Sequence, residues 1–162
     1  MGVRPTLGDM PIEEAALMLQ GLYLRDVYQI SNGTPGILGS LAPGSAGIGR
    51  RRLRYRRADP NERWQSVREV WATMGGDCED LASAVAAELT VNGIPARPVV
   101  YRVRPGLVHV VTQIEGTGEL FDPSKVGGMG ETKSGGLWFD PQAARVQIGQ
   151  LLASQRGPGG WV

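Results

Sequence analysis

Residues 75–82 read GGDCEDLA and contain Cys78, the only cysteine of the 162-residue chain. This stretch has the pattern of a helix start, because Asp77 can accept a hydrogen bond from the amide of Asp80 and Asp80 can reach back in the same way. The unpaired N–H groups and the positive dipole at such a start stabilise a thiolate. Cys78 is therefore a candidate nucleophile, with an inert packing cysteine as the alternative.

The predicted helix continues to Asn92-Gly93, a helix-ending pair. Leu81, Val85 and Leu89 lie on one face and alanines fill much of the rest, which predicts a buried helix. Three acids adjoin the cysteine and raise the pKa of a nearby thiol. We expect this conflict to be relieved if the acids point outward to cap the helix and a cationic imidazole faces the sulfur. The acids are Asp77, Glu79 and Asp80.

His109 is the only histidine and follows this helix in a region rich in Val and Ile. Runs at 97–103, 107–114 and 119–121 are separated by turn residues, which predicts three antiparallel strands. If the second hairpin turns at Gly116-Thr117, Asp122 lies opposite Val111, on the same face as His109 and one diagonal step away. A slip of one residue would move Asp122 to the other face.

This spacing allows a Cys-His-Asp triad. Cys78 would attack an acyl carbon, His109 would take the thiol proton and return it to the leaving amine, and Asp122 would fix the imidazole tautomer. Backbone N–H groups at the helix start would bind the oxyanion. Taken singly, His109 could be a core residue, and Asp122, which precedes Pro123, could simply begin a turn.

The pieces GGDCEDLASAVAAELTVNGIPARPVVYRV, HVV and ELFDPS, in this order, resemble the core of the transglutaminase-like superfamily, including its bacterial and phage cysteine-proteinase branch. The resemblance covers roughly residues 64–125. It implies an α+β fold with a papain-like core, in which the helix bearing the cysteine packs on a small antiparallel sheet and Cys78, His109 and Asp122 occupy the catalytic positions. It also implies an oxyanion donor upstream of the cysteine. The candidates for this donor are Trp64, Gln65 and Trp71.

Four segments are predicted along the chain. The first is an N-terminal amphipathic helix ending at residue 30, with Glu13 and Glu14 in its first turn. Residues 31–52 form a Gly-, Pro- and Arg-rich linker arm with no regular element, residues 53–125 the core, and residues 126–162 a Gly-rich arm with a short helix at 141–154. The apolar face of the first helix is expected to contain Ile12, Ala16, Leu19, Tyr23, Val27 and Ile30.

A further helix is predicted from the sequence DPNERWQSVREVW. Asp59 has the place of the N-cap, Pro60 that of the first helical residue and Glu62 that of the capping-box acid. Trp64, Val67, Val70 and Trp71 would then share the face that packs on the core.

The run RRRLRYRR at 50–57 holds six arginines. It could bind an anionic partner, and the alternative is a solvated arm or an edge strand guarded by charge. Nucleic acid is an unlikely partner, because the formal net charge of the whole chain is only +1. The arginines of this candidate patch are Arg50, Arg51, Arg52, Arg54, Arg56 and Arg57.

The composition excludes several classes of protein. A single cysteine forms no internal disulfide, and no Cys or His cluster has metal-ligand spacing, so we expect neither a metal nor a cofactor. No apolar stretch approaches the roughly 20 residues of a membrane helix, and charges interrupt the start of the chain, so we expect no signal peptide and no membrane partner. The predicted location is the cytoplasm or a phage-like particle.

Two functions follow as hypotheses. The first is a thiol-dependent amide hydrolase or acyl transferase of cysteine-peptidase type, acting on a peptide or protein, with hydrolysis favoured. The second is a structural or assembly component of a phage-like particle or tail. It is suggested by the two arms, because segments of this composition are usually ordered only across a protein partner.

Overall fold

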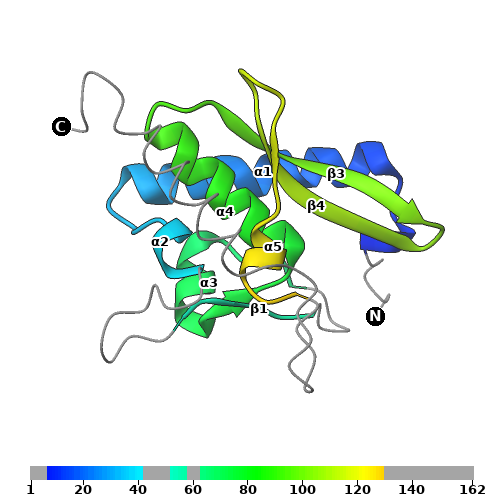
Figure 1. The fold of residues 1–162 in the computed structure, drawn as a ribbon, viewed down its shortest axis with the longest axis horizontal. Coiled ribbons are helices and arrows are strands. Elements are labelled where there is room, and N and C mark those ends of the chain that lie inside the picture. Colours follow the sequence, from blue (N-terminus) through cyan, green and yellow to red (C-terminus); the bar gives the residue numbers. More distant parts are fainter. Residues whose placement is uncertain (1–6, 42–51, 58–62, 130–162) are drawn as a thin grey trace.

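The helix that begins at Cys78 lies at the centre of the molecule. The computed structural model describes residues 7–41, 52–57 and 63–129. Helix α4 (Cys78–Val91) packs between the long helix α1 (Ile12–Ser31) and a three-stranded sheet, as Figure 1 shows. All its residues from Cys78 to Ala87 are buried, which confirms the prediction of a buried helix and explains why alanines are used on its remaining faces.

The sheet has the order β3-β4-β5 and is antiparallel throughout, as predicted. Strands β3 (Ala96–Arg104) and β4 (Leu107–Ile114) form the long hairpin of Figure 1, and β5 (Leu120–Phe121) adds a short third strand. Thr112 pairs with Phe121 and Gln113 with Leu120. This is the register that the turn at Gly116-Thr117 predicts.

Helix α1 has the predicted length, and the face that it presents to the core overlaps the predicted one only in part. Its buried residues are Ala15, Leu19, Leu22, Asp26 and Gln29, whereas Ala16 is exposed and Tyr23, Val27 and Ile30 are only partly buried. The expected face is confirmed in part, because Leu19 is buried and Ile12, Tyr23 and Ile30 pack against the core clusters, whereas Ala16 was placed there wrongly. Two of the buried residues, Asp26 and Gln29, are polar, and their side chains accept hydrogen bonds from the backbone of another helix. The spacing of apolar residues in the sequence does not indicate such buried polar positions.

That other helix is α3 (Val67–Thr73), and it starts later than predicted. Oδ1 of Asp26 accepts from the N–H of Val67 at 2.7 Å, and Oε1 of Gln29 accepts from the N–H of Arg68 at 3.1 Å. The side chain of Ser66, the N-cap residue, makes no capping bond. The two side chains from α1 therefore take over the capping of the first turn of α3. Residues 63–66 are not helical, which contradicts a helix running on from Asp59. Asp59, Pro60 and Glu62 themselves lie outside the described residues.

The described part of the expected linker also differs from the prediction. Residues 38–41 form the short helix α2 (Leu38–Leu41), and Ile37, Leu38 and Leu41 are completely buried in the main core. The N–H of Leu38 donates to Oε2 of Glu88 at 2.9 Å, which fixes this segment on α4. Burial of the apolar side chains between the glycines therefore gives this segment a regular structure despite its Gly- and Pro-rich composition. Residues 42–51 lie outside the described residues.

Short elements complete the architecture. The turn η1 (Leu7–Asp9) precedes α1; β1 (Arg54–Tyr55) pairs in parallel with β2 (Gly75–Gly76), just before α4; and α5 (Pro123–Val126) follows β5. The predicted helix at 141–154 lies outside the described residues. The molecule has an α+β fold with a small antiparallel sheet, as predicted.

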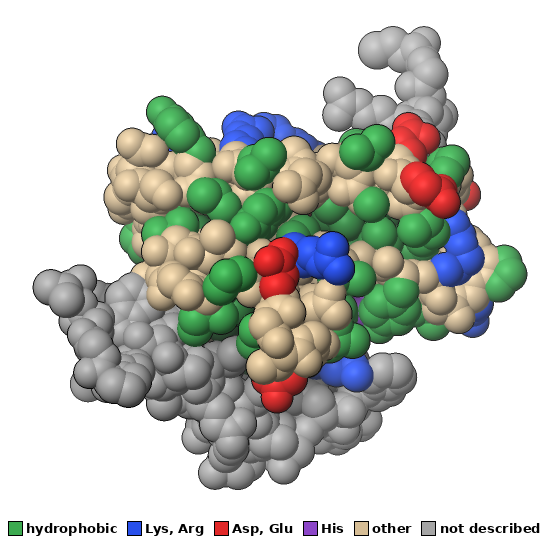
Figure 2. All heavy atoms as spheres, turned by 90° about the horizontal axis from the view of Figure 1, so that it is seen from above, with side chains coloured by type: hydrophobic (Ala, Val, Ile, Leu, Met, Phe, Trp, Pro, Cys, Tyr) green, Lys and Arg blue, Asp and Glu red, His purple; other side chains and the backbone are tan. Residues whose placement is uncertain are grey.

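The surface is mixed rather than uniformly polar. Figure 2 shows hydrophobic side chains between polar and charged ones over the face seen from above. On α1, Leu17, Leu24 and Tyr28 are exposed. Even so, no helix in the described parts of the chain has both the length and the hydropathy needed to cross a membrane.

Candidate active site

Cys78 is the first residue of α4, and the predicted capping box closes around it. The N–H of Asp80 donates to Oδ1 of Asp77 at 3.4 Å, and the N–H of Asp77 donates to Oδ2 of Asp80 at 3.3 Å. These two bonds fix the turn that carries the cysteine. The thiol lies at the positive end of the helix dipole, as the sequence pattern predicts.

The acids around the thiol do not point outward, which corrects the expectation from the sequence. Asp77, Glu79 and Asp80 are all buried, and Glu79 is only 1% exposed. The Sγ atom of Cys78 donates to Oε2 of Glu79 at 3.3 Å. Burial, followed by the charges of Glu79 and Asp77, raises the pKa of the Cys78 thiol far above its ordinary value. In this conformation the thiol is protonated and is 9% exposed.

The carboxyl groups of these three acids also hold their protons more strongly than usual. Burial is the main cause, and it raises the pKa of Glu79 to about 7 and those of Asp77 and Asp80 to about 8. One oxygen from each lies within 4.8 Å of the others, a spacing that could hold a cation. The same groups already bond one another, the thiol and the backbone, so the arrangement also serves as an internal network.

His109 and Asp122 form the second half of the site. Nε2 of His109 lies 2.7 Å from Oδ2 of Asp122, and their side chains are 12% and 18% exposed. Oδ1 of Asp122 accepts from the N–H groups of Ser124 and Lys125 and so caps α5. Because Nε2 is bound to the carboxylate, Nδ1 is the ring nitrogen left for a proton from another group.

Strand β4 brings the two halves of the site together. A backbone hydrogen bond from Val110, the neighbour of His109, lowers the pKa of the Cys78 thiol and opposes the effect of burial. The sulfur therefore touches β4 next to the histidine. No hydrogen bond joins Cys78 to His109 among the described residues; Glu79 accepts the hydrogen bond of the thiol instead.

Two tyrosines near the site were missed from the sequence. Tyr101 pairs with His109 across the β3–β4 hairpin, and its ring stands edge-on to the imidazole at 5.8 Å. Burial, with the charges of Asp122 and Cys78, raises the pKa of Tyr101. The hairpin centred on Pro105 was a signal that could have placed Tyr101 there. Burial and then the charge of Cys78 raise the pKa of Tyr55 to about 12, and its place in an arginine run gave no such signal.

The three upstream candidates for an oxyanion donor differ in what their side chains contact. Nε1 of Trp71 donates to the Pro35 carbonyl at 2.8 Å. The amide of Gln65 donates to the Gly75 carbonyl and to Asp80, both at 3.2 Å. Trp64 packs against the hydrophobic cluster that contains Cys78. Trp71 and Gln65 are thus committed to the scaffold, and Trp64 is the candidate beside the thiol.

The arginine run does not form one surface. Arg52 donates to the carbonyls of Leu41 and Val126 and joins two segments of the fold. Arg54 belongs to β1, in agreement with the edge-strand alternative, and Arg56 donates to the Thr73 carbonyl. Arg57 is exposed. Arg50 and Arg51 lie outside the described residues.

The thiol at the start of α4 and the imidazole–carboxylate pair on the neighbouring strands are the groups needed for acyl transfer through a thioester. Residues 48–125 match the family model of the transglutaminase-like superfamily. No curated protein and no solved structure matches the chain.

Proposed function

We propose, from the match of residues 48–125 to the transglutaminase-like superfamily, that the protein is a thiol-dependent amide hydrolase or acyl transferase of cysteine-peptidase type. The domain match fits this general class of function. The specific assignment rests on the 2.7 Å bond between His109 and Asp122. His109 lies on β4, and its neighbour Val110 on the same strand contacts the sulfur of Cys78. Its substrate would be a peptide or a protein.

The reaction would run in two steps. The sulfur of Cys78 attacks the carbonyl carbon of an amide, while Nδ1 of His109 takes the thiol proton. The C–N bond then breaks, the imidazolium returns the proton to the leaving amine, and a thioester remains on Cys78. Asp122 acts as a positioning residue, because its bond to Nε2 holds the tautomer in which Nδ1 accepts and stabilises the imidazolium.

The thiol would be activated during the reaction and not beforehand. Glu79 and the apolar surroundings favour the neutral thiol, so a preformed thiolate and imidazolium pair is not the resting state of this conformation. General-base transfer to His109 on substrate binding avoids that requirement. The N–H of Cys78 and the indole N–H of Trp64 are the proposed donors to the oxyanion.

Water or an amine could release the acyl group from the thioester. Water gives hydrolysis, and an amine gives transamidation. We propose hydrolysis, the outcome that the sequence analysis favours.

A defined peptide library tests this function. The wild type and Cys78→Ala are incubated with the same library, and mass spectrometry records new N-termini, new amide cross-links and deamidated glutamines. We expect new N-termini that are lost in Cys78→Ala. If no product of any of these three types depends on Cys78, the proposed function is wrong.

The closed thiol favours a second candidate function, a structural or assembly component that uses the domain as a scaffold, with a phage-like particle as its setting. Cys78 is 9% exposed and is bonded to a buried carboxyl group, which is compatible with a packing role. In this case Cys78→Ala would leave assembly unchanged, while loss of residues 130–162 of the C-terminal arm would abolish it. The bacterial and phage branch of the superfamily is part of this proposal.

A further inference from the structure

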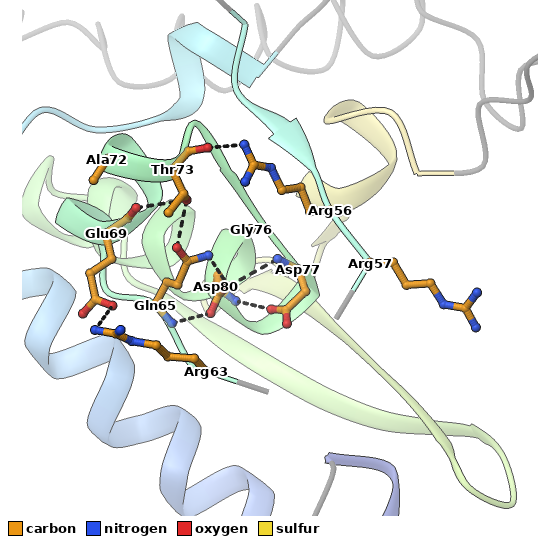
Figure 3. A pocket seen from close by; sticks show the side chains of 10 residues that line it. All are labelled: Arg56, Arg57, Arg63, Gln65, Glu69, Ala72, Thr73, Gly76, Asp77 and Asp80. Atoms are coloured by element: carbon orange, nitrogen blue, oxygen red, sulfur yellow. Dashed lines mark hydrogen bonds and ion pairs between the residues drawn. The ribbon is translucent and has the colours of Figure 1, made fainter. Parts of the chain in front are cut away.

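A pocket of about 480 Å³ opens between α3, β1 and the start of α4. Figure 3 shows the side chains that line it. Asp77, which directly precedes the nucleophile, lies in its wall together with Gly76 and Asp80. The volume falls within the range of about 300–1,000 Å³ that is typical of ligand sites. The pocket and the thiol thus share one turn of backbone.

Three arginines border this pocket, and they are held to different degrees. Arg56 is bound to the Thr73 carbonyl, which fixes it as part of the wall. Arg63 pairs with Glu69 at 3.4 Å, but its side chain is 80% exposed. Arg57 makes no ion pair or hydrogen bond within the described residues and extends away from the other lining side chains (Figure 3). Two guanidinium groups at the rim can therefore turn toward a ligand.

The charge balance of the pocket favours an anion. Its acidic lining residues are Glu69, Asp77 and Asp80. Burial raises the pKa values of Asp77 and Asp80 to about 8, so both carboxyl groups are largely protonated at neutral pH. The ionised groups that remain in the lining are then three guanidinium groups and the carboxylate of Glu69, which pairs with Arg63 and Arg25. Gln65 and Thr73 add polar groups, although their side chains already bond to each other.

We propose that this pocket binds an acidic side chain of an extended peptide substrate, close to the bond that Cys78 attacks. Residues of an extended chain are about 3.3 Å apart, and Asp77 adjoins Cys78 in the chain. A substrate residue within a few positions of the attacked carbonyl would then lie against the arginines. The inference rests on the proposed function and adds the chemical class of the substrate.

The lining favours a carboxylate from a peptide over a nucleic acid. No aromatic side chain is among the described residues that line the pocket, so it offers no platform on which bases could stack. The formal charge of +1 for the whole chain provides no general attraction for a polyphosphate. Arginine suits a carboxylate, because its planar fork can donate two parallel hydrogen bonds to it.

Binding is measured with Cys78→Ala, so that no chemistry on the probe interferes. The probes are two fluorescein-labelled peptides, Gly-Glu-Gly-Glu-Gly and Gly-Gln-Gly-Gln-Gly, and labelled oligothymidylate, all followed by fluorescence anisotropy at low salt. Arg57→Gln and Arg63→Gln are added singly to this background. Arg97→Gln is the matched control, since Arg97 is exposed, its side chain bonds to Gln113 and it does not line the pocket.

We expect the Glu peptide to bind more tightly than the Gln peptide, and each rim variant to weaken the Glu peptide about threefold, a typical effect for one exposed charge pair. Added salt should weaken the same complex. Arg97→Gln should have no effect. The proposal is overturned if neither peptide binds at 1 mM, if both bind equally, if Arg97→Gln weakens binding as much as the rim variants, or if oligothymidylate binds more tightly through the same arginines.

This test is separate from the test of catalysis. If the protein binds the Glu peptide as expected but forms no Cys78-dependent product from the library, the anion site is supported and the proposed function is wrong. If the protein cleaves peptides through Cys78 without preference for acidic residues and does not bind the Glu peptide, the proposed function is supported and the anion site is wrong.

Discussion

Nε2 of His109 lies 2.7 Å from Oδ2 of Asp122, although 13 residues separate them in the chain. The distance follows from the pairing of β4 with β5, in which Thr112 lies opposite Phe121. Continued by one residue, this register places Asp122 opposite Val111, one diagonal step from His109 on the same face. The carboxylate therefore reaches the imidazole without any irregularity in the sheet.

Asp122 has two roles, and two substitutions separate them. Asp122→Asn keeps an oxygen for the N–H groups of Ser124 and Lys125, but it no longer holds the tautomer in which Nδ1 of His109 accepts a proton. We expect Cys78-dependent turnover of a library peptide to fall on the order of 10⁴-fold, with little change in the free energy of unfolding. Asp122→Ala should lose as much turnover and also about 1 kcal/mol of stability through the lost helix cap. Wild-type turnover in Asp122→Asn would refute the positioning role.

The sequence alone predicted the elements whose formation depends on residues close together in the chain. The start of α4 was predicted because Asp77 and Asp80 satisfy each other within one turn. The register that brings Asp122 to His109 was predicted from a turn centred on Gly116-Thr117, and the observed turn has this centre, with the N–H of Gly118 bonded to the Ile114 carbonyl at 2.8 Å. In both cases a few neighbouring residues contain all the information.

The failed predictions depend on contacts between distant segments. The start of α3 is determined by Asp26 and Gln29, about 40 residues earlier in the chain, and nothing near Val67 reveals this. Glu79 was expected to face solvent because it is charged and lies in the first turn of a helix. It is buried instead, because α4 is covered on all sides and the thiol supplies a partner.

Glu79→Gln should make the Cys78 thiol more reactive. The substitution removes the negative charge that raises the thiol pKa and keeps a side chain of similar size. We expect alkylation by iodoacetamide at pH 8 to become at least about threefold faster, since the thiolate fraction rises as the thiol pKa falls. The rate is measured against pH by intact-protein mass spectrometry.

Glu115→Gln is the control for this variant, because Glu115 is exposed in the turn between β4 and β5. Its alkylation profile should match that of the wild type. If Glu79→Gln reacts at the wild-type rate or more slowly at every pH, Glu79 is not what keeps the thiol protonated.

Gly75→Ala should destabilise the segment that leads into α4. A Cβ atom at this position would lie 2.4 Å from the Arg54 carbonyl oxygen, the backbone on which β2 pairs. We expect a loss of about 1–3 kcal/mol in the free energy of unfolding, as for other overpacked sites. Urea denaturation measures it. Gly21→Ala is the matched variant, because its Cβ meets nothing within 4 Å and it lies inside α1, where alanine should stabilise the helix by about 0.5–1 kcal/mol. Equal stability of the two variants would contradict the close packing of β1 and β2.

The buried acids predict that the fold is less stable in mild alkali than in mild acid. Burial raises the pKa of Asp26 from 3.8 to about 7, so between these values the folded chain keeps a proton that the unfolded chain has lost. The free energy of unfolding therefore falls as the pH rises through this window. Asp77, Glu79 and Asp80 act in the same direction, up to a pH of about 8.

Urea unfolding at pH 5.5 and pH 8.5 measures this change, and Asp26→Asn assigns part of it. An Asn side chain can still accept from the N–H of Val67 but never ionises. We expect the variant to lose less stability than the wild type between the two pH values, with a difference of about 1.4 kcal/mol for each pH unit between pH 5.5 and the folded pKa of Asp26, about 7. Glu13→Gln, at an exposed position in the first turn of α1, should follow the wild type. A wild-type protein that is as stable at pH 8.5 as at pH 5.5 would show that these carboxyl groups are hydrated or paired when they ionise.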